Sequence, residues 1–413
     1  MAILAPKYRI FLSTLLFLSA PLSVHAAIKT IPFEVSGWLP YWRVATSTAD
    51  VLPRISSLTS VMPFGYTVRN DGTLFDAYGL GSPTSSTSPL ASALITAARS
   101  AKVRVVPTVM WSNGAAIHAT LSNKAKRIAL ENRIATLAKS QGFDGIDIDF
   151  EGKYAKTKPY FSLFLEGLYQ RMGNKWVYCA IEARTPLSSR YDGTPPPDAT
   201  EYANDFVAIN KYCDRVELMT YDQQTIDVKL NKAANGTPYI PVSDTKWVEK
   251  TVTLAAKTIA KKKLVIGVAT YGYEWEVTAL SESGFRYDLQ WAFNPRYALE
   301  LATSLGIIPM RNSAGEMSFL YTPTTTPLTE GRETVPPQNS QPMATTAISY
   351  EAAFAGPTRL DPPPPQNILW WSDAQAIQEK IELATKLGLR GVAIFKLDGG
   401  EDQALWDLLP KKK

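Results

Sequence analysis

The amino-acid sequence predicts an α/β protein, a (β/α)8 (TIM) barrel with an inserted α+β subdomain between strands seven and eight. Two observations support this prediction. Short runs rich in β-branched residues alternate with longer segments whose apolar residues recur at helical spacing, which is typical of parallel strands joined by helical crossovers. The alternation then fails over one long stretch near the C-terminus. An open doubly wound sheet would give much the same local pattern.

The strand candidates are short, apolar and rich in valine and isoleucine. The eight best are 33–38, 60–63, 103–109, 145–150, 176–181, 216–221, 264–270 and 392–395. The segments with helical periodicity are 124–140, 160–172, 246–261 and 374–387. Eight such units within a few hundred residues favour a closed barrel over an open sheet.

The alternation stops between residues 274 and 367. This stretch contains a helix-like run at 296–305, followed by tracts rich in proline and threonine. A structureless loop of that length is uncommon inside a compact domain. We therefore expect residues 274–367 to form an inserted α+β subdomain that walls one side of a groove.

The first 26 residues have the pattern of a secretory signal peptide. Lys7 and Arg9 precede the apolar run 10–18, and small residues around position 26 offer a cleavage site. A membrane anchor is the alternative, but this run is too short for a hydrocarbon core of roughly 30 Å. We expect residues 1–26 to be removed and residues 27–413 to be exported as the catalytic domain, without a membrane span.

Composition limits the chemistry. The 43 basic and 38 acidic side chains give a net charge of +5 without a long basic cluster, so nucleic acid is not expected as a partner. One of the two histidines, His25, lies in the expected signal peptide. His118 alone cannot form a His-pair metal site and leaves little room for a Ser-His-Asp triad. Acid–base chemistry would therefore fall to carboxylates.

The chain has two cysteines, Cys179 and Cys213, which lie in or beside predicted strands. Export would permit a disulfide between them. Two separately buried thiols are the simpler interpretation, and we favour it over a disulfide.

The most informative segment is 142–151, Gly-Phe-Asp-Gly-Ile-Asp-Ile-Asp-Phe-Glu. Because side chains alternate along a strand, the carboxylates Asp147, Asp149 and Glu151 share one face and apolar side chains share the other. Inside a barrel, neighbouring carboxylates raise one another's pKa, and a carboxyl that stays protonated at neutral pH can act as a general acid. A Ca²⁺ or Mg²⁺ site, or a solvated edge strand, is the alternative that the Ile-x-Ile pattern disfavours.

The spacing Asp144-x-x-Asp147-x-Asp149-x-Glu151 resembles the D-x-x-D-x-D-x-E signature of glycoside hydrolase family 18, the chitinase-like (β/α)8 enzymes. Further similarities extend along almost all of the mature chain, at 37–42, 219–222, 267–275, 370–374 and 388–391. The runs 271–275, 370–374 and 388–391 are most similar to the branch of spore-cortex-lytic and spore-germination hydrolases. Asp144 begins the motif, and we expect it to brace the strand.

The resemblance implies a substrate-assisted, retaining mechanism that needs no metal or organic cofactor. Glu151 would protonate the glycosidic oxygen and later act as a base. Asp149 would hold the acetamido N–H of the substrate, and Asp147 would share a proton with Asp149. Tyr221 would donate its hydroxyl to the acetamido oxygen, while Asp222 would bind the sugar or tune Glu151.

Sugar rings bind with their apolar faces against aromatic side chains. Several aromatic residues lie at or just beyond predicted strand ends, and those expected to contact substrate are Trp38, Tyr41, Phe64, Tyr271, Trp371 and Phe395. Trp371 and Phe395 are the first choices. Phe395 also departs from the family pattern, in which a tryptophan usually forms the floor of the −1 subsite.

The resulting prediction is a secreted, monomeric hydrolase that cleaves β-1,4 linkages of an N-acetylglucosamine-containing polysaccharide. The branch resemblance favours peptidoglycan over chitin. A catalytically weak or inactive carbohydrate-binding protein, a chitinase-like lectin, is the alternative that Phe395 leaves open. A metal-dependent barrel hydrolase is disfavoured by the lack of histidines.

Overall fold

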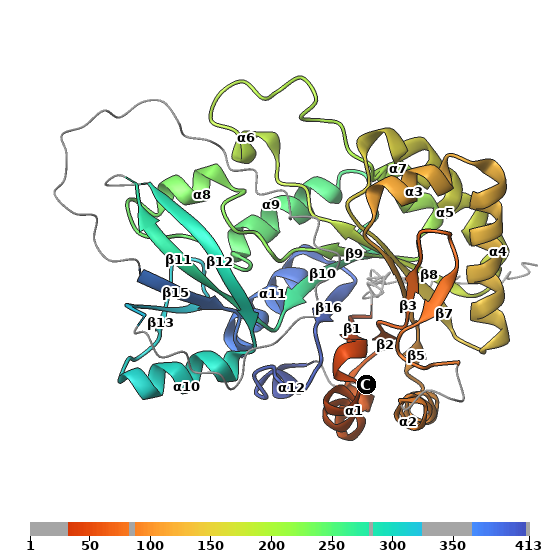
Figure 1. Ribbon diagram of the computed structural model, residues 1–413, viewed down its shortest axis with the longest axis horizontal. Coiled ribbons are helices and arrows are strands. Elements are labelled where there is room, and N and C mark those ends of the chain that lie inside the picture. Colours follow the sequence, from red (N-terminus) through yellow and green to blue (C-terminus); the bar gives the residue numbers. More distant parts are fainter. Residues whose placement is uncertain (1–31, 82–86, 281–283, 324–365, 410–413) are drawn as a thin grey trace, which may run out of the picture. The chain divides into compact units, whose positions relative to one another are not determined.

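The structure is a computed structural model that describes residues 32–81, 87–280, 284–323 and 366–409 (Figure 1). The expected signal peptide, residues 1–26, lies outside these ranges. Within them, no helix combines the length and apolar character needed to span a membrane.

Most strands of the described chain belong to one curled sheet, largely parallel (Figure 1). From β1 (Glu34–Leu39) the pairing runs through β16 (Gly391–Phe395), β10 (Leu264–Ala269), β9 (Arg215–Met219), β8 (Trp176–Glu182), β7 (Gly145–Phe150) and β6 (Thr108–Trp111). On its other side β1 pairs with β2 (Ser60–Pro63), and β2 pairs with β5 (Arg104–Val105). Because β5 leads directly into β6, this order returns to its starting point with eight strand positions, in agreement with the predicted (β/α)8 barrel.

The second and third barrel strands are each broken into two pieces. The predicted strand 103–109 is split between β5 and β6 at Pro107, which has no N–H to donate. After β2 the chain resumes as β3 (Tyr66–Val68), which pairs in parallel with β6 and forms a hairpin with β4 (Leu74–Asp76). The sequence patterns did not predict this hairpin.

Helices pack on the outer faces of the barrel strands. The longer ones are α1 (Val44–Val51), α2 (Ser88–Ser100), α3 (Gly114–Leu121), α4 (Lys124–Ser140), α5 (Lys158–Met172), α7 (Phe206–Tyr212), α9 (Thr245–Ala255) and α11 (Ala374–Leu387). The shorter ones are α6 (Leu187–Arg190), α8 (Val228–Ala233) and α12 (Leu405–Leu408). The 3-10 turns are η1 (Tyr41–Arg43), η2 (Leu52–Ser57) and η3 (Ala155–Thr157). Ile146, Ile148 and Phe150 of β7 lie in the apolar core beneath these helices, where Phe150 stacks on Phe164 of α5.

A second, antiparallel sheet occupies the described part of the expected insertion. Its strand order is β12 (Phe285–Phe293), β11 (Gly272–Ala279), β15 (Gln366–Trp371), β14 (Met317–Tyr321) and β13 (Met310–Arg311). Helix α10 (Pro295–Leu305) follows β12. These elements extend slightly beyond both ends of the expected range 274–367, of which residues 281–283 and 324–365 lie outside the described part. That this stretch folds as a subdomain of its own stays a prediction.

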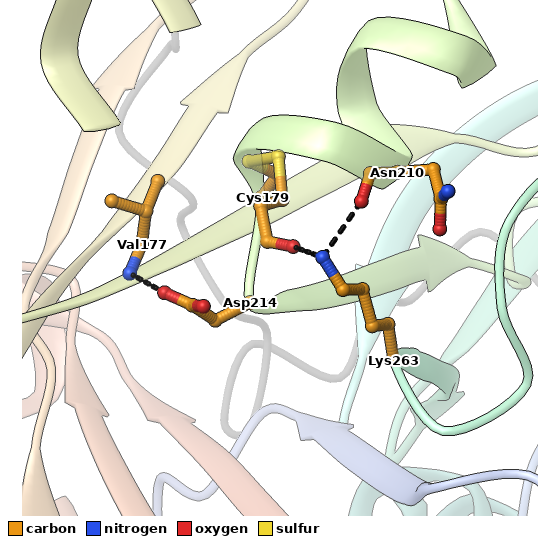
Figure 2. Close-up of a disulfide and its surroundings, with 6 residues drawn as sticks. Val177, Cys179, Asn210, Asp214 and Lys263 are labelled. Atoms are coloured by element: carbon orange, nitrogen blue, oxygen red, sulfur yellow. Dashed lines mark hydrogen bonds between the residues drawn. A yellow bond between two sulfur atoms is a disulfide. The ribbon is translucent and has the colours of Figure 1, made fainter. Parts of the chain in front are cut away.

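The expectation of two free thiols is wrong, because Cys179 and Cys213 form a disulfide (Figure 2). Cys179 lies on β8, and Cys213 lies just before β9, the strand that pairs with β8. The surrounding backbone is also tied together. Lys263 Nζ donates to the carbonyl oxygens of Asn210 and Cys213 at 2.7 and 2.8 Å, and Val177 N donates to Asp214 Oδ2 at 2.9 Å.

The amino-terminal ends of the strands, the barrel base, are joined by ion pairs around one carboxylate. Glu34 of β1 is 3% exposed and forms ion pairs with Arg104 at 3.0 Å, Arg215 at 2.5 Å and Arg390 at 2.5 Å. Burial acts to raise the pKa of Glu34, but hydrogen bonds from the three guanidinium groups outweigh it and hold the pKa well below its ordinary value. The base is thus held by an ionised, multiply paired glutamate.

Candidate active site

The acidic face of β7 points into the barrel. Asp147 is completely buried, and its Oδ2 accepts hydrogen bonds from Trp38 Nε1 at 3.0 Å and from Thr108 Oγ1 at 2.8 Å. Burial raises the pKa of Asp147 to about 6, although these two hydrogen bonds act to lower it. At the start of the motif, Asp144 Oδ2 accepts from Val105 N at 2.8 Å, which ties β7 to the third strand.

The next two carboxylates lie progressively nearer the carboxyl ends of the strands, the barrel mouth. Asp149 is 3% exposed, whereas Glu151, just past the end of β7, is half-buried. Burial raises the pKa of Asp149 well above its ordinary value, and the neighbouring Glu151 and Asp147 raise it further. Burial and the charge of Glu182 raise the pKa of Glu151 to about 7. Because a hydrogen bond joins the two carboxyl groups, they titrate as a pair.

Tyr221 and Asp222 follow β9 at the same end of the barrel. Tyr221 is 9% exposed, and the pKa of its hydroxyl is raised by burial and then by Asp149. Asp222 has a left-handed backbone with φ 56°, a conformation uncommon outside glycine. The hydroxyls of Tyr271 and Tyr273 both donate to Asp222 Oδ1 at 2.7 Å. These two bonds fix the carboxylate despite the unusual backbone.

Four of the predicted aromatic side chains gather beside these polar groups. Phe395 stacks on Tyr221 with ring centroids 5.5 Å apart and an interplanar angle of 17°. Trp38, Phe64 and Tyr271 approach the Phe395 ring at 5.9, 6.4 and 6.0 Å. Phe395 is partly buried in this cluster, between the interior of the barrel and the tyrosines after β9 and β10.

The other two predicted aromatics are placed differently. Tyr41 is half-buried at the edge of the cluster that contains Trp38 and Phe64, with centroid distances of 4.9 Å for Tyr41–Trp42 and 6.0 Å for Trp42–Phe64. Trp371 is 1% exposed and packs against Phe293 and Phe319 inside the second sheet. The structure therefore does not bring Trp371 together with the carboxylates, and its ring offers no open face to a sugar.

Two acidic residues beside the motif were missed in the sequence. Register pairs Asp149 with Ala180 of β8, and Ala180 with Glu217 of β9, so all three lie in one row on the inner face of the barrel. Two residues beyond Ala180 lies Glu182, at the end of β8 beside Glu151. A charged residue that interrupts or ends an otherwise apolar strand could have indicated both positions.

Together these groups can carry out acid–base chemistry on a neutral ligand. A carboxyl with a raised pKa at the mouth can supply a proton, and the buried carboxylates below it can accept hydrogen bonds from a ligand N–H. Tyr221 provides a hydroxyl donor, and the Phe395 cluster provides apolar surface. Within the described residues, no group of three or more His, Cys, Asp or Glu side chains could hold a metal ion.

Comparison with known proteins identifies the family. The model of "Glycosyl hydrolases family 18" matches residues 66–400, which is most of the chain. The chain belongs to glycosyl hydrolase family 18. This membership confirms the resemblance found in the D-x-x-D-x-D-x-E motif, and it makes the protein a glycoside hydrolase by family.

Individual proteins are similar to most of the chain. An uncharacterized glycosylase, YvbX of Bacillus subtilis, is 24% identical over 291 residues, covering 70% of this chain and 67% of YvbX. The spore cortex-lytic enzyme SleL of Bacillus megaterium superposes with a TM-score of 0.64 at 22% identity, covering 94% of this chain and 77% of SleL. A class V chitinase from Pseudomonas fluorescens gives a TM-score of 0.65 at 20% identity, covering 92% of this chain and 98% of the chitinase. The two structures share the fold of this chain.

Proposed function

We propose that the protein is a secreted glycosidase that hydrolyses β-1,4 linkages next to N-acetylglucosamine, by substrate-assisted retaining catalysis. The observation that carries the proposal is the row of three carboxylates on the inner face of β7, whose pKa values are all raised. A carboxyl with a pKa near 7 is protonated often enough at neutral pH to act as a general acid. Family membership supplies the reaction class.

The reaction begins with proton transfer. Glu151 donates its proton to the glycosidic oxygen as the bond from that oxygen to C1 of the −1 sugar breaks. The carbonyl oxygen of the 2-acetamido group attacks C1 from the other face and forms an oxazolinium intermediate. Asp149 accepts a hydrogen bond from the acetamido N–H and offsets the positive charge, while Tyr221 donates its hydroxyl to the acetamido oxygen.

Hydrolysis then restores the enzyme. The Glu151 carboxylate removes a proton from a water molecule as the water oxygen attacks C1, and the bond from C1 to the acetamido oxygen breaks, which reopens the oxazolinium ring. Two successive inversions at C1 retain the anomeric configuration. Asp147, buried beneath Asp149 and held by Trp38 and Thr108, is positioned to share a proton with Asp149 as the charge changes.

The proposed polymer is peptidoglycan, with chitin as the alternative of the same chemistry. The similarity to a spore cortex-lytic enzyme supports the first, and the similarity to a chitinase supports the second. Both contain N-acetylglucosamine, which the acetamido mechanism requires. An extracytoplasmic location is part of the proposal because residues 1–26 have the pattern of a signal peptide.

The test is mass spectrometry of products from residues 27–413 incubated with peptidoglycan and with N-acetylglucosamine oligomers. Glu151→Gln keeps the shape of the side chain but removes the acid, so its rate should fall on the order of 10²-fold or more. The reducing ends of the products would identify the bond cleaved. Products formed equally fast by Glu151→Gln would contradict the assignment of the acid.

A carbohydrate-binding protein without turnover is the second candidate, favoured by one observation. Phe395 supplies a smaller ring than tryptophan in the cluster around Tyr221. Retained binding of N-acetylglucosamine oligomers, with no products from the unaltered chain, would select this candidate over the hydrolase.

A further inference from the structure

The carboxylate of Glu182 is held beside Glu151 by three donors. Asn204 Nδ2 donates to Glu182 Oε2 at 2.6 Å, and Gly152 N donates to Oε1 at 3.2 Å. Lys153 Nζ lies 3.4 Å from Oε2 and 3.5 Å from Oε1. Two of the three donors come from the residues that immediately follow Glu151, so the end of β8 is fastened to the backbone that carries the catalytic acid.

Lys153 is an unusual partner for a side chain at a barrel mouth. Its side chain is 1% exposed, and its Nζ lies 4.9 Å from the centroid of the Phe161 ring. The Glu182 side chain, in contrast, is 42% exposed. The ammonium group is therefore sequestered beneath the mouth, while the carboxylate it pairs with remains partly open to solvent beside Glu151.

A second layer fixes Asn204. Arg184, two residues after Glu182, donates to the carbonyl oxygen of Asn204. The Arg184 guanidinium lies between the rings of Tyr202 and Phe206, with its Cζ 3.9 Å from each ring centroid. The loop that presents Asn204 is thus packed in place by a cation–π sandwich, and Glu182 is held in one orientation.

We propose that Glu182 and Lys153 form a charge pair that positions Glu151 and sets its protonation state, with opposite effects from the two members. Glu182 acts through Glu151 and is a positioning residue. This proposal rests on the proposed function, because it assigns a control element to the same acid. The family motif that includes Glu151 does not include Glu182 or Lys153.

The opposite effects follow from charge. The titratable groups that face Glu151 are Asp149 on β7, Glu182, Lys153, Asp222 and Tyr221. The like charge of Glu182 raises the pKa of Glu151, and the opposite charge of Lys153 lowers it. Burial acts to raise the pKa of Glu182, but Lys153 and the hydrogen bonds to the carboxylate lower it by more. The pKa of Glu182 is therefore below its ordinary value. Glu182 is therefore ionised when Glu151 needs to be protonated.

The experiment compares pH profiles of kcat/KM for two shape-preserving variants, Glu182→Gln and Lys153→Met, on an N-acetylglucosamine oligomer. The alkaline limb of this profile reports the loss of the proton from Glu151 in the free enzyme. Glu182→Gln should move that limb to lower pH, and Lys153→Met should move it to higher pH. Because the Glu182 side chain is partly solvated, the change at a fixed pH on the limb should be about two- to fivefold.

The matched control is Glu249→Gln. Glu249 is 43% exposed and pairs with Lys386 at 3.0 Å on the outer helices, so its exposure matches that of Glu182 and its partner is also a lysine, although an exposed one. This variant should leave the alkaline limb in place. A limb that moves in the same direction in Glu182→Gln and Lys153→Met, or that stays unmoved in both, would overturn the proposal.

A second readout separates this proposal from the proposed function. ¹³C-carboxyl NMR of the glutamates, with the Glu151 signal identified by its loss in Glu151→Gln, follows the titration of Glu151 directly. If the unaltered chain gave no products, the hydrolase proposal would fail, but opposite shifts of this titration would still support the charge pair. Normal turnover with an unshifted Glu151 titration in both variants would defeat the charge pair alone.

Discussion

The two ends of the barrel surround their carboxylates in opposite ways. At the base, Glu34 is buried among three arginines, and its pKa is held well below the ordinary value. At the mouth, Asp149 is equally buried, but its nearest charges are other carboxylates, and its pKa is raised. Burial raises the pKa at both ends, so the partners decide the sign of the net shift.

This difference separates stability from function within one sheet. A fully paired carboxylate at the base stabilises the fold when it is ionised, whereas crowded acids at the mouth make the ionised state costly and keep a proton available. Barrel enzymes place their chemistry at the carboxyl ends of the strands. We therefore expect substitutions at the base to change unfolding and substitutions at the mouth to change turnover.

The largest effect is expected at the base. Glu34→Gln would leave the buried Arg215 and the partly buried Arg104 and Arg390 without their carboxylate, and should lower the free energy of unfolding by about 3–5 kcal/mol. Because the pKa of Glu34 is lowered in the folded state, its stabilisation is fully present above its ordinary pKa of 4.5, begins to decline at about pH 4 and is lost as the pH falls toward the lowered folded-state pKa. Urea unfolding at pH 7 and pH 4 measures both quantities.

Glu249→Gln serves as the surface control for Glu34→Gln, since it removes an exposed ion pair worth at most about 1 kcal/mol. A Glu34→Gln variant as stable as this control would mean that the base network contributes little. The comparison between base and mouth would then fail on its stability side.

The next effect concerns the mouth. Asp149→Asn removes the charge proposed to stabilise the intermediate, and kcat should fall on the order of 10²- to 10³-fold. Its thermal midpoint should hold or rise, because one member of a crowded group of acids is neutralised. Steady-state kinetics on an N-acetylglucosamine oligomer and thermal unfolding are measured on the same sample. A large loss of stability together with retained kcat would reverse the assignment of this residue.

A smaller effect is expected from the disulfide, which ties β8 to Cys213, two residues before β9. Replacing Cys179 and Cys213 by alanine releases a link between residues 34 positions apart and should cost about 2–4 kcal/mol. Because the link lies on the outer side of the sheet, in the apolar core beneath the helices, kcat should be unchanged at temperatures where the variant is folded. Denaturant unfolding of the unaltered chain, with and without a reductant, is compared with that of the variant. Equal midpoints for the oxidised chain and the variant would contradict the expected cost.

Strongly patterned elements could be predicted from the sequence. The expected helices 124–140 and 374–387 match α4 and α11 because their starts carry local signals: Asn123 accepts from Lys126 N, and Asp373 accepts from Ala376 N. The acidic strand was predicted at 145–150, where β7 lies, from alternation alone. The helix expected at 246–261 ends at Ala255. The predicted end was too late because the apolar spacing continues to Ile259, which is buried but lies outside the helix.

Features that depend on distant pairing could not be predicted. The disulfide forms because β8 and β9 are neighbours, which local patterns do not reveal. Trp371 was expected in a groove, but β15 lies inside the second sheet, between β11 and β14, and both of its faces are covered. Trp370 and Trp371 consequently lie in separate apolar clusters, and neither exceeds 2% exposed. A pair of adjacent tryptophans cannot by itself distinguish such a strand from a substrate platform.

The smallest effect tests whether crowding at the mouth costs stability. Glu217 of β9 is completely buried in the row that contains Asp149, and neither of its carboxyl oxygens has a hydrogen-bond partner among the described residues. A buried polar group without a partner costs about 1–3 kcal/mol. Glu217→Met removes the group while filling a similar volume, so it should raise the free energy of unfolding by an amount in this range.

The pH dependence of this gain identifies its origin. Burial, and then Asp147, raise the pKa of Glu217 above its ordinary value of 4.5, so the folded state retains a proton that the unfolded chain releases. The unaltered protein therefore loses stability as the pH rises above 4.5, and the advantage of Glu217→Met should grow over the same range. Glu217→Gln should remove the pH-dependent part but leave an unpartnered amide, so its gain should be smaller. A gain independent of pH, or a loss in Glu217→Met, would mean that Glu217 is paired at the mouth as Glu34 is at the base.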